Sequence, residues 1–479
     1  MNRYRFAVVG AGPAGAYTTS ALLTGTAAAG VPAQVDLLDR LPTPWGLVRS
    51  GVAPDHPQTR SVTRVFERVV DHPDARFLGG IEIGRDLTHH DLLELYDAVV
   101  YATGAPDDRP LAVPGAEPPV AVPGVDLPRA VPGVDLPRAV PGVDLPRAVP
   151  GVDLPGSLAA GRFVRWYNGH PDAADERIVL DHHRAVVVGN GNVALDCARL
   201  LVRDPTELAR TDIADPALAA FTDSRIREVV VLGRRHPARA AFTLPELAEL
   251  GRLTGVDVVV DAPDLAGDGP VLDALRDLAA RPVHPGRRRL VLRFQVSPVA
   301  LVGERRVTAL DLVHNDIVDG RVQPTGRTER LDCGLVVHAV GFRGRPLPGV
   351  PFDERHGHVA HTAGRVAPRV YVAGWAKRGP SGVVGTNRKC ATETVAGVLA
   401  DLADGTLRAG GHDPDKTLAQ LRDRCPDLVT LDGWRRIDAA ELAAGAAQGR
   451  PRVRFTTTAA LLAAARGPGS APDPSPRRR

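Results

Sequence analysis

Two glycine-rich turns, each lying between an apolar β-branched segment and a segment rich in small residues, constrain the fold of this chain more than any other feature. The first is VVGAGPAGAY at residues 8–17, and the second is VVVGNGNVAL at residues 186–195. A strand, a glycine turn and a helix in this order form the phosphate-binding unit of a dinucleotide fold. The chain has 479 residues, which is long enough for two or three domains and therefore for two such units.

The first turn belongs to the segment YRFAVVGAGPAG, whose G-x-G-x-x-G glycines are Gly10, Gly12 and Gly15. The first glycine permits the tight turn, the second lets the backbone approach a pyrophosphate, and the third lets the helix pack closely on the strand. A second apolar segment, AQVDLLDR, ends at Asp39, which is placed to accept a hydrogen bond from a ribose hydroxyl. The pattern therefore predicts a dinucleotide site near the N-terminus.

The second turn carries Gly189, Gly191 and Ala194, a G-x-G-x-x-A variant of the same pattern. The strand expected after its helix, REVVVLGRR, ends in Arg234 and Arg235, where an NAD-binding domain has an acidic residue. Guanidinium groups favour a 2′-phosphate there, because they offer planar cationic donors to a dianion. The second site is predicted to bind NADP(H), with two solvated surface arginines as the alternative interpretation.

Two dinucleotide sites in one chain indicate a flavoprotein that a nicotinamide nucleotide reduces. The apolar segments DAVVYATGA (97–105) and CGLVVHAVGF (333–342) end in A-x-G patterns, which suit the points where the chain passes between two domains. The predicted fold class is α/β, with two Rossmann-like doubly wound domains and the NADP domain inserted into the FAD domain. The predicted boundaries are 1–110 and 340–466 for the FAD domain, 111–156 for an insertion, 157–339 for the NADP domain and 467–479 for a disordered tail.

The insertion is a tandem repeat of nine residues. The unit AVPGVDLPR occupies 121–129, 130–138 and 139–147, with AVPGVDLPG after it at 148–156 and a degraded copy, AVPGAEPPV, before it at 112–120. Proline and glycine in every unit exclude a helix and a central strand, which predicts an extended, partly polyproline-like surface segment. The segment is about three units longer than a domain crossing requires, and an arm that docks a partner is the alternative.

Composition indicates which cell compartment and which kinds of partner to expect. The chain has no run of about 18 uncharged apolar residues and no secretory signal pattern, so we expect a cytoplasmic protein without membrane insertion. The four cysteines never form C-x-x-C, so neither a metal site nor a dithiol redox pair is predicted, and buried apolar positions are expected for them. The basic residues are almost all arginine, an excess that genome composition mostly explains, although the basic balance, with a net charge of +3, would also suit an acidic protein partner; nothing indicates nucleic acid binding. Monomer and homodimer both stay open.

Four longer motifs carry a resemblance to a known family. They are LPTPWGLVRSGVAPDHP (41–57), GNGNVALDCARLL (189–201), GRRHPARAAFTLPELAEL (233–250) and YVAGWAKRGPSGVVGTNRK (371–389). In this order they resemble the NADPH:ferredoxin reductases of the adrenodoxin reductase type, including the bacterial members, and the likeness extends from Tyr4 to about Phe455.

The resemblance implies cofactor-binding roles for individual residues. The FAD contacts of the family fall on Ala14, Asp39, Leu47, Ile83, Trp375, Gly382, Val383 and Val384. The NADP contacts fall on Asn190, Gly191, Asn192, Val193, Arg234, Arg235, Glu246 and Gly382. A histidine and a glutamate near the nicotinamide correspond to His56 and Glu249. Asp39 stands where the family usually has a glutamate, which shortens the reach to the ribose by one methylene.

Physical arguments support several of these roles. The run GPSGVV precedes an amphipathic segment, so we expect a helix to begin near Gly382, with its positive end toward the negative charge of a reduced flavin. Trp375 suits a cofactor wall, with a core aromatic as the alternative. His56 and Glu249 are expected to orient and polarise the nicotinamide, because hydride transfer itself needs no general acid or base. Glu246, which follows Pro245, also suits a helix N-terminus.

The implied activity is the transfer of electrons from NADPH through FAD to an acidic ferredoxin or a similar iron-sulfur protein. A flavin monooxygenase, or another reductase with a different acceptor, is the main alternative, and an FAD-containing sensor without turnover is a further one. An enzyme of the thioredoxin reductase kind would need a C-x-x-C pair, which the sequence lacks.

Overall fold

The first apolar segment of the chain forms the central strand β1 (Tyr4–Val9) of a seven-stranded sheet in the computed structural model, which describes residues 3–112 and 148–467. The order is β18-β19-β4-β1-β2-β3-β20. Neighbouring strands from β19 to β3 are parallel, whereas β18 and β20 are antiparallel edges. The other strands are β2 (Ala33–Asp39), β3 (Ala75–Gly79), β4 (Ala98–Tyr101), β18 (Arg365–Ala367), β19 (Val370–Val372) and β20 (Val429–Thr430).

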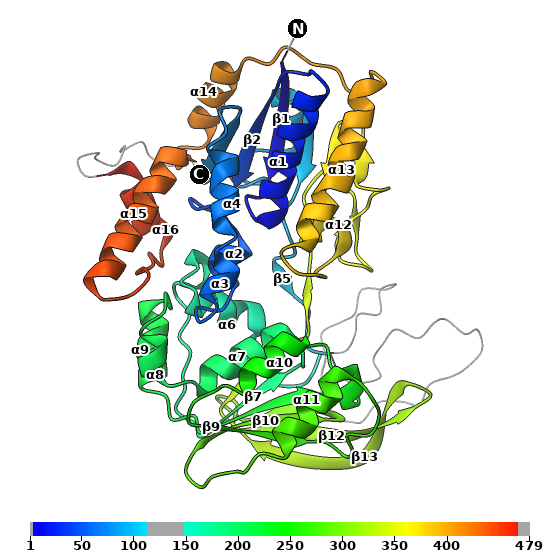
Figure 1. The fold of residues 1–479 in the computed structure, drawn as a ribbon, viewed down its shortest axis with the longest axis vertical. Helices are drawn as coiled ribbons and strands as arrows, with labels where there is room; N and C mark the ends of the chain where they lie inside the picture. The colour runs from blue at the N-terminus through cyan, green and yellow to red at the C-terminus, as the bar shows by residue number, and fades with distance from the viewer. Residues whose placement is uncertain (1–2, 113–147, 468–479) are drawn as a thin grey trace.

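Helices α1 (Pro13–Ala28) and α13 (Thr386–Ala403) pack side by side on this sheet, in the upper lobe of Figure 1. They approach closely at Gly25, where a Cβ atom would lie 2.6 Å from Leu399 Cδ1, so a larger residue would require the leucine side chain to move. The other helices of this lobe are α2 (Leu47–Ser50), α3 (Pro57–Arg60), α4 (Thr63–Val70), α5 (His89–Leu95), α12 (Trp375–Arg378), α14 (Pro414–Arg424), α15 (Leu431–Ala447) and α16 (Thr458–Arg466).

The lower lobe contains a six-stranded parallel sheet, in the order β6-β14-β7-β8-β10-β9. Its strands are β6 (Ser157–Ala159), β7 (Arg184–Val188), β8 (Glu228–Gly233), β9 (Val256–Asp261), β10 (Arg288–Phe294) and β14 (Leu335–His338). A three-stranded antiparallel sheet of β11 (Val296–Val302), β12 (Ala309–Val318) and β13 (Arg321–Asp332) packs against it.

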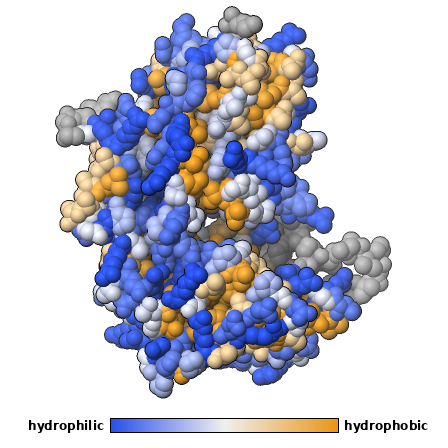
Figure 2. Space-filling view, in the orientation of Figure 1, coloured by the Kyte–Doolittle hydropathy of each residue, from blue (hydrophilic) through white to orange (hydrophobic). Residues whose placement is uncertain are grey.

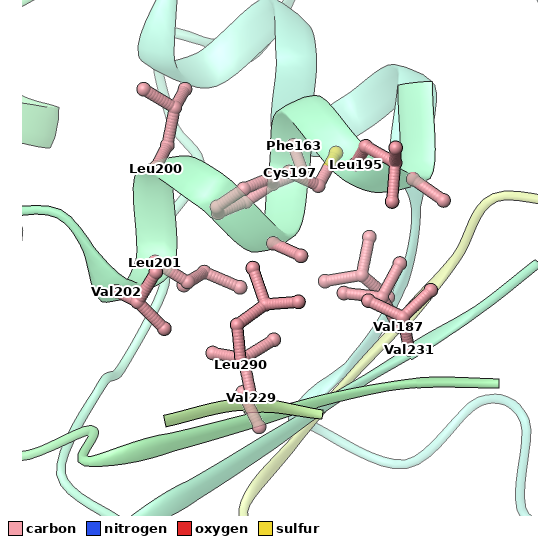
Figure 3. Packing of buried hydrophobic residues seen from close by; sticks show 14 of the residues in the cluster. Phe163, Val187, Leu195, Cys197, Leu200, Leu201, Val202, Val229, Val231 and Leu290 are labelled. Atoms are coloured by element: carbon pink, nitrogen blue, oxygen red, sulfur yellow. The ribbon is translucent and has the colours of Figure 1, made fainter. Parts of the chain in front are cut away.

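Helices cover the other face of the parallel sheet. Figure 3 shows the leucines of α7 (Asn192–Val202) packed over strand residues that include Val187, Val229, Val231 and Leu290. Cys197 lies in this core, and all four cysteines are free and buried, as the sequence predicts. The remaining helices are α6 (Ala160–Tyr167), η1 (Pro171–Ala173), α8 (Pro205–Leu208), α9 (Asp215–Thr222), η2 (Pro237–Arg239), α10 (Leu244–Leu250) and α11 (Pro270–Ala279).

The chain crosses twice between the lobes, and the two crossings pair with each other. Strands β5 (Asp107–Asp108) and β15 (Phe342–Arg343) run antiparallel directly after the two A-x-G segments. The upper sheet therefore takes its strands from 4–101 and 365–430, and the lower sheet takes its strands from 157–338. The predicted α/β fold class, with one dinucleotide-type domain inserted into another, is confirmed.

Buried charges also join the two lobes. The carboxylate of Asp212, in the lower lobe, accepts hydrogen bonds from the guanidiniums of Arg60 and Arg454, both in the upper lobe. Burial alone would raise the pKa of Asp212, but the charges of Arg454 and Arg60 outweigh it and lower the pKa to about 2. Within the described ranges, no helix has both the length and the apolar character to cross a membrane.

Only the last copy of the nonapeptide, 148–156, lies within the described residues; the copies at 121–147 and the tail at 468–479 lie outside them. Ala112 and Ala148 form a β-bridge, so the two ends of the stretch that lies outside meet. Gly156 has φ +95°, and a Cβ there would lie 2.6 Å from Gly334 O. The three copies at 121–147 have arginine at this position. A residue with a side chain would not fit there, so the copy that ends in Gly156 is the one that can pack against the sheet.

Candidate active site

The first glycine turn follows β1 at the end that faces the lower lobe (Figure 1). Gly10 has φ +106°, and a Cβ there would lie 2.5 Å from Ala102 O. At Gly15 a Cβ would lie 1.8 Å from Gly10 O. The packing of the protein itself therefore requires both glycines.

Gly12 is different, because none of its described neighbours requires a glycine there. Its φ is −78°, and a Cβ there would meet only Gly46 Cα, at 3.8 Å, among the described non-neighbouring atoms. Gly12 is also the N-cap of α1, where no side chain caps the first-turn N–H groups. Free N–H groups at the positive end of a 16-residue helix, with open space above the glycine, fit an anionic phosphate.

The second turn repeats this division. Gly189 has φ +119° and a Cβ would lie 2.2 Å from Ala339 O, whereas Ala194 is fully buried where the first turn has its third glycine. Gly191 has φ −94°, and a Cβ there would meet only Ala241 Cβ, at 4.0 Å, in the described part of the chain. Gly191 is the N-cap of the 11-residue helix α7, again without a side-chain cap. The second turn thus offers the same anion-binding geometry as the first.

The acidic and basic strand ends lie where the sequence places them. Asp39, at the end of β2, accepts hydrogen bonds from Ala11 N (2.8 Å) and Leu41 N (2.9 Å), and burial raises its pKa. Its carboxylate therefore also fixes the glycine turn. Arg234 and Arg235 follow β8 and are exposed, and their side chains make no hydrogen bond or ion pair within residues 3–112 and 148–467. Both guanidiniums are thus available to an anion.

The neighbours of the second turn are held in place by side-chain amides. The Asn192 side chain accepts a hydrogen bond from Thr243 N at 2.8 Å, and Asn190 lies against Gly233, where a Cβ would be 2.7 Å from its Nδ2. Val193 is half-buried against the core of the lower lobe. Buried Asn315 donates to the carbonyl of Arg234 at 3.1 Å and so fixes the strand end that carries the arginines.

The residues that the resemblance assigns to FAD lie around the first turn and α12. Ala14 is buried against Gly374, where a Cβ would lie 2.3 Å from the Ala14 Cβ. Trp375, the first residue of α12, is half-buried, and its Nε1 donates to Ser381 O at 3.1 Å. Leu47 and Val383 are apolar yet 49% and 66% exposed, and Ile83 and Val384 are half-buried. Figure 2 shows apolar side chains along this lobe down to the hollow between the lobes.

One expectation for this region is wrong. Helix α13 begins at Thr386, four residues after Gly382, where the sequence suggested its start. Gly382 has φ +80°, which a right-handed helix excludes, and the Val383 N–H donates to Thr386 Oγ1 at 3.2 Å. The segment from Gly382 to Gly385 therefore forms an irregular turn ahead of the helix.

His56 and Glu249 come together across the two lobes. His56 precedes α3 in the upper lobe, and its Nε2 lies 2.5 Å from Oε2 of Glu249, on α10 of the lower lobe. The His56 side chain is 14% exposed, and its Nδ1 lies 3.9 Å from Asp196 Oδ1. Asp55, the residue before His56, binds Arg199 and Arg203.

Arg199 organises this cluster, and the sequence analysis did not single it out. Its guanidinium, almost fully buried, donates to Asp55 at 2.8 and 3.0 Å and to Asp196 at 2.7 Å. Its Nη1 lies 3.6 Å from carboxylate oxygens of both Glu246 and Glu249 and has no hydrogen-bond partner among the described residues. A buried arginine on a helix face gives no sequence signal beyond the DCAR spacing, because, apart from Asp196 on its own helix, its partners come from two distant segments.

The cluster holds more acidic than cationic groups, so the pKa of some of its carboxyl groups is lowered and that of others is raised. Burial would raise the pKa of Asp55, but its hydrogen bonds from Arg199 outweigh the burial and lower it. Burial raises the pKa of Asp196, and burial together with the charge of Asp196 raises the pKa of Glu246. The lobes thus meet in a polar, partly desolvated site with a histidine, spare carboxylates and one unsatisfied guanidinium N–H.

No family model matches the chain, but it has relatives among known proteins. NADPH-ferredoxin reductase FprA of Mycobacterium tuberculosis is 42% identical over 489 residues, which cover 96% of this chain and 99% of that protein. The mitochondrial NADPH:adrenodoxin oxidoreductase of Arabidopsis thaliana is 35% identical and covers 96% of this chain and 94% of its own length.

A solved structure agrees with the sequence relatives. Mycobacterium tuberculosis FprA in complex with NADPH superposes with a TM-score of 0.86 at 41% identity, covering 97% of this chain and 100% of that one. Both the likeness in sequence and the likeness in fold extend over nearly the whole chain. The chain belongs to the family of NADPH-ferredoxin reductases of the adrenodoxin reductase type.

Proposed function

We propose that this protein is an oxidoreductase that transfers electrons from NADPH through FAD to a ferredoxin-type iron-sulfur protein. The observation that carries the proposal is the pair of uncapped helix N-termini, each beside a glycine that the packing does not need. A protein without ligands at these places would tolerate a side chain at Gly12 and Gly191. Both positions keep space for a phosphate, and one chain therefore fits two dinucleotides.

The upper lobe fits FAD. Gly12 and the N-terminus of α1 would hold its pyrophosphate, and the free lone pairs of Asp39 would accept from its ribose. The exposed apolar side chains of Leu47 and Val383, and the half-buried Trp375, would cover its ring system. When bound, FAD accepts two electrons from NADPH and passes them on one at a time.

The lower lobe fits NADPH. Gly191 and the N-terminus of α7 would hold the pyrophosphate, with Asn190, Asn192 and Val193 around it. Arg234 and Arg235 would bind the 2′-phosphate that distinguishes NADPH from NADH, because they are exposed and otherwise unengaged in the described structure.

His56 and Glu249 would contact the nicotinamide end of the nucleotide. They lie on opposite lobes, and their 2.5 Å hydrogen bond would close the site where the two cofactors would approach each other. Arg199, bound to Asp55 and close to Glu249, would keep both groups in place. Because the redox step needs no obligatory proton shuttle, their role is to orient the ring and exclude water.

The proposed partner is an acidic ferredoxin, and the proposed compartment is the cytoplasm. Lys389, 84% exposed at the start of α13, and the exposed Arg388 beside it lie close to the turn that carries Gly382 and Val383, and the whole chain has a net charge of +3. Such charges would steer an acidic partner toward the flavin edge and make the rate depend on salt. Four unpaired thiols suit a reducing compartment.

An anaerobic titration with NADPH and with NADH, followed by flavin absorbance, tests the proposal. Wild-type protein is expected to be yellow and to be bleached at much lower NADPH than NADH. The Arg234→Ala/Arg235→Ala variant is expected to need at least about 10-fold more NADPH for the same bleaching, with little change in the NADH that it needs. A colourless protein, or equal bleaching by both nucleotides, would refute the assignment. Reduction of an acidic ferredoxin that slows as salt rises would support the partner, and a rate that salt does not change would exclude it.

A further inference from the structure

A group of metal-ligating side chains lies outside the nucleotide sites, on a hairpin of the upper lobe. The hairpin consists of β16 (Phe352–Asp353) and β17 (His358–Val359), in which Asp353 and His358 are directly opposite each other. His356 lies in the turn between the strands. One potential ligand atom from each of Asp353, His356 and His358 lies within 4.8 Å of the other two. We propose that this hairpin is a binding site for a divalent transition metal of the zinc type.

The chemistry of the three groups suits such an ion. Two imidazoles and one carboxylate are the ligand set of many three-residue zinc sites, in which water takes the fourth position. Mg²⁺ and Ca²⁺ prefer all-oxygen sites, so two histidines select against them. The ligands come within six residues of one turn, and the chain needs no long loop to bring them together.

The hydrogen bonds of the hairpin leave suitable ring nitrogens for the metal. His358 Nδ1 donates to Val359 O at 3.0 Å, which keeps the proton on Nδ1 and leaves Nε2 as a free lone pair. His356 Nδ1 lies 2.7 Å from Asp353 Oδ2. Two ligands of a tetrahedral zinc ion lie roughly 3.3 Å apart, so the metal could replace the shared proton after a shift of well under 1 Å.

A neighbouring histidine is excluded from the ligand set. His361, whose ring centre lies 5.9 Å from that of His358, donates from Nε2 to Lys377 O at 2.8 Å. Its Nδ1 accepts from Gly364 N at 3.2 Å, so both of its nitrogens are occupied. It ties the hairpin to α12 instead, and the metal would keep three protein ligands and one open position.

The backbone of the turn is fixed, so the ligands are held before any metal arrives. Gly357 N donates to Asp353 O at 2.7 Å, and His356 N donates to Asp353 Oδ1 at 3.0 Å. Gly344 N donates to Gly357 O at 2.7 Å, which attaches the turn to the residues directly after the crossing strand β15. A metal at the hairpin would therefore stiffen the segment next to the second crossing between the lobes.

Equilibrium dialysis of the tag-free, full-length flavoprotein against ZnCl2, with MgCl2 in excess, tests the site. The wild type is expected to bind one more equivalent of zinc than the His356→Gln/His358→Gln variant. His90→Gln removes another exposed histidine, whose ion pair in the described part of the chain is with Glu94, and should bind as the wild type does. Thermal unfolding in EDTA shows whether all three proteins are equally folded. His56, Glu246 and Glu249 also form a group that could take a metal, and they are unchanged in every variant.

A spectroscopic measurement identifies the ligands. Cu²⁺ added at one equivalent should give an EPR spectrum with coupling to two nitrogens, which the His358→Gln variant reduces to one. The proposal is overturned if the double variant binds as much zinc as the wild type. It is also overturned if the copper spectrum of the His358→Gln variant is the same as that of the wild type.

Discussion

Substituting alanine at Gly191 should separate the folding role of the second turn from its binding role. The backbone at Gly191 has φ −94°, which alanine adopts without strain, and the new Cβ would lie 4.0 Å from Ala241 Cβ, an ordinary van der Waals contact. Alanine is worse than glycine as an N-cap by about 0.5–1 kcal/mol but gains about 0.4–1 kcal/mol from a less flexible unfolded chain. The free energy of unfolding should therefore change by less than about 1 kcal/mol.

The effect on NADPH should be much larger. The methyl group would occupy the space through which the pyrophosphate approaches the N–H groups of α7. Losing one charge-assisted hydrogen bond costs about 1.5–3 kcal/mol. At 1.4 kcal/mol per tenfold change, the Kd for NADPH should rise about 10- to 150-fold. Isothermal titration calorimetry measures the Kd, and urea unfolding measures the stability of the same preparation.

Gly189→Ala is the matched contrast two residues away. Its φ of +119° and a Cβ placed 2.2 Å from Ala339 O should destabilise the protein by about 3 kcal/mol or more. The reasoning fails if Gly191→Ala leaves the Kd for NADPH unchanged, because the space would then not be the phosphate site. It also fails if Gly191→Ala unfolds as readily as Gly189→Ala.

Three further outcomes follow from the structure. Glu249→Gln, or His56→Gln, should slow reduction of the flavin by NADPH roughly 10- to 100-fold in single-turnover stopped flow while the Kd changes little, and an unchanged rate would remove the pair from the site. Burial lowers the pKa of His170 and of His338 from 6.5 to about 4, so the unfolded state binds protons first as the pH falls from 6.5 to 4. The free energy of unfolding should fall over that range by up to about 3 kcal/mol for each, and a flat profile in urea titrations would contradict this. Deleting residues 121–147 should leave activity unchanged and raise stability by about 1 kcal/mol, because the ends at Ala112 and Ala148 already meet; lost activity would instead indicate a docking arm.

Local sequence patterns were sufficient to predict the parts of the fold that local chemistry determines. The glycine turns, the strands before them and Asp39 at the end of β2 are where the sequence places them, because strand periodicity and turn residues act over a few positions. The start of α13 was misplaced because an amphipathic pattern extends through residues whose backbone is not helical. Gly382 has a positive φ, so the helix cannot include it, and the sequence pattern does not reveal this backbone conformation.

The cluster between the lobes could not be predicted from the residues alone. His56 and Glu249 entered through a family resemblance, since 192 residues separate them in the chain and no spacing rule connects them. Arg199 was missed for the same reason: its carboxylate partners come from the His56 loop, from its own helix and from α10. Buried charge networks depend on tertiary contacts, which hydrophobic periodicity does not encode.

Arg199 also gives a physical route by which the nucleotide site and the opposite lobe are joined. It lies on α7, the helix whose uncapped N-terminus at Gly191 would hold the pyrophosphate, and eight residues of rigid helix connect the two points. From α7 its guanidinium binds Asp55, which precedes His56 in the upper lobe, and lies 3.6 Å from Glu249. An anion that fixes the start of α7 would therefore also fix Arg199, which binds Asp55 beside His56 and lies close to Glu249. Arg199→Met would leave Asp55 and Asp196 buried without this cation, so it should impair the orientation of His56 and Glu249 even with every nucleotide contact intact.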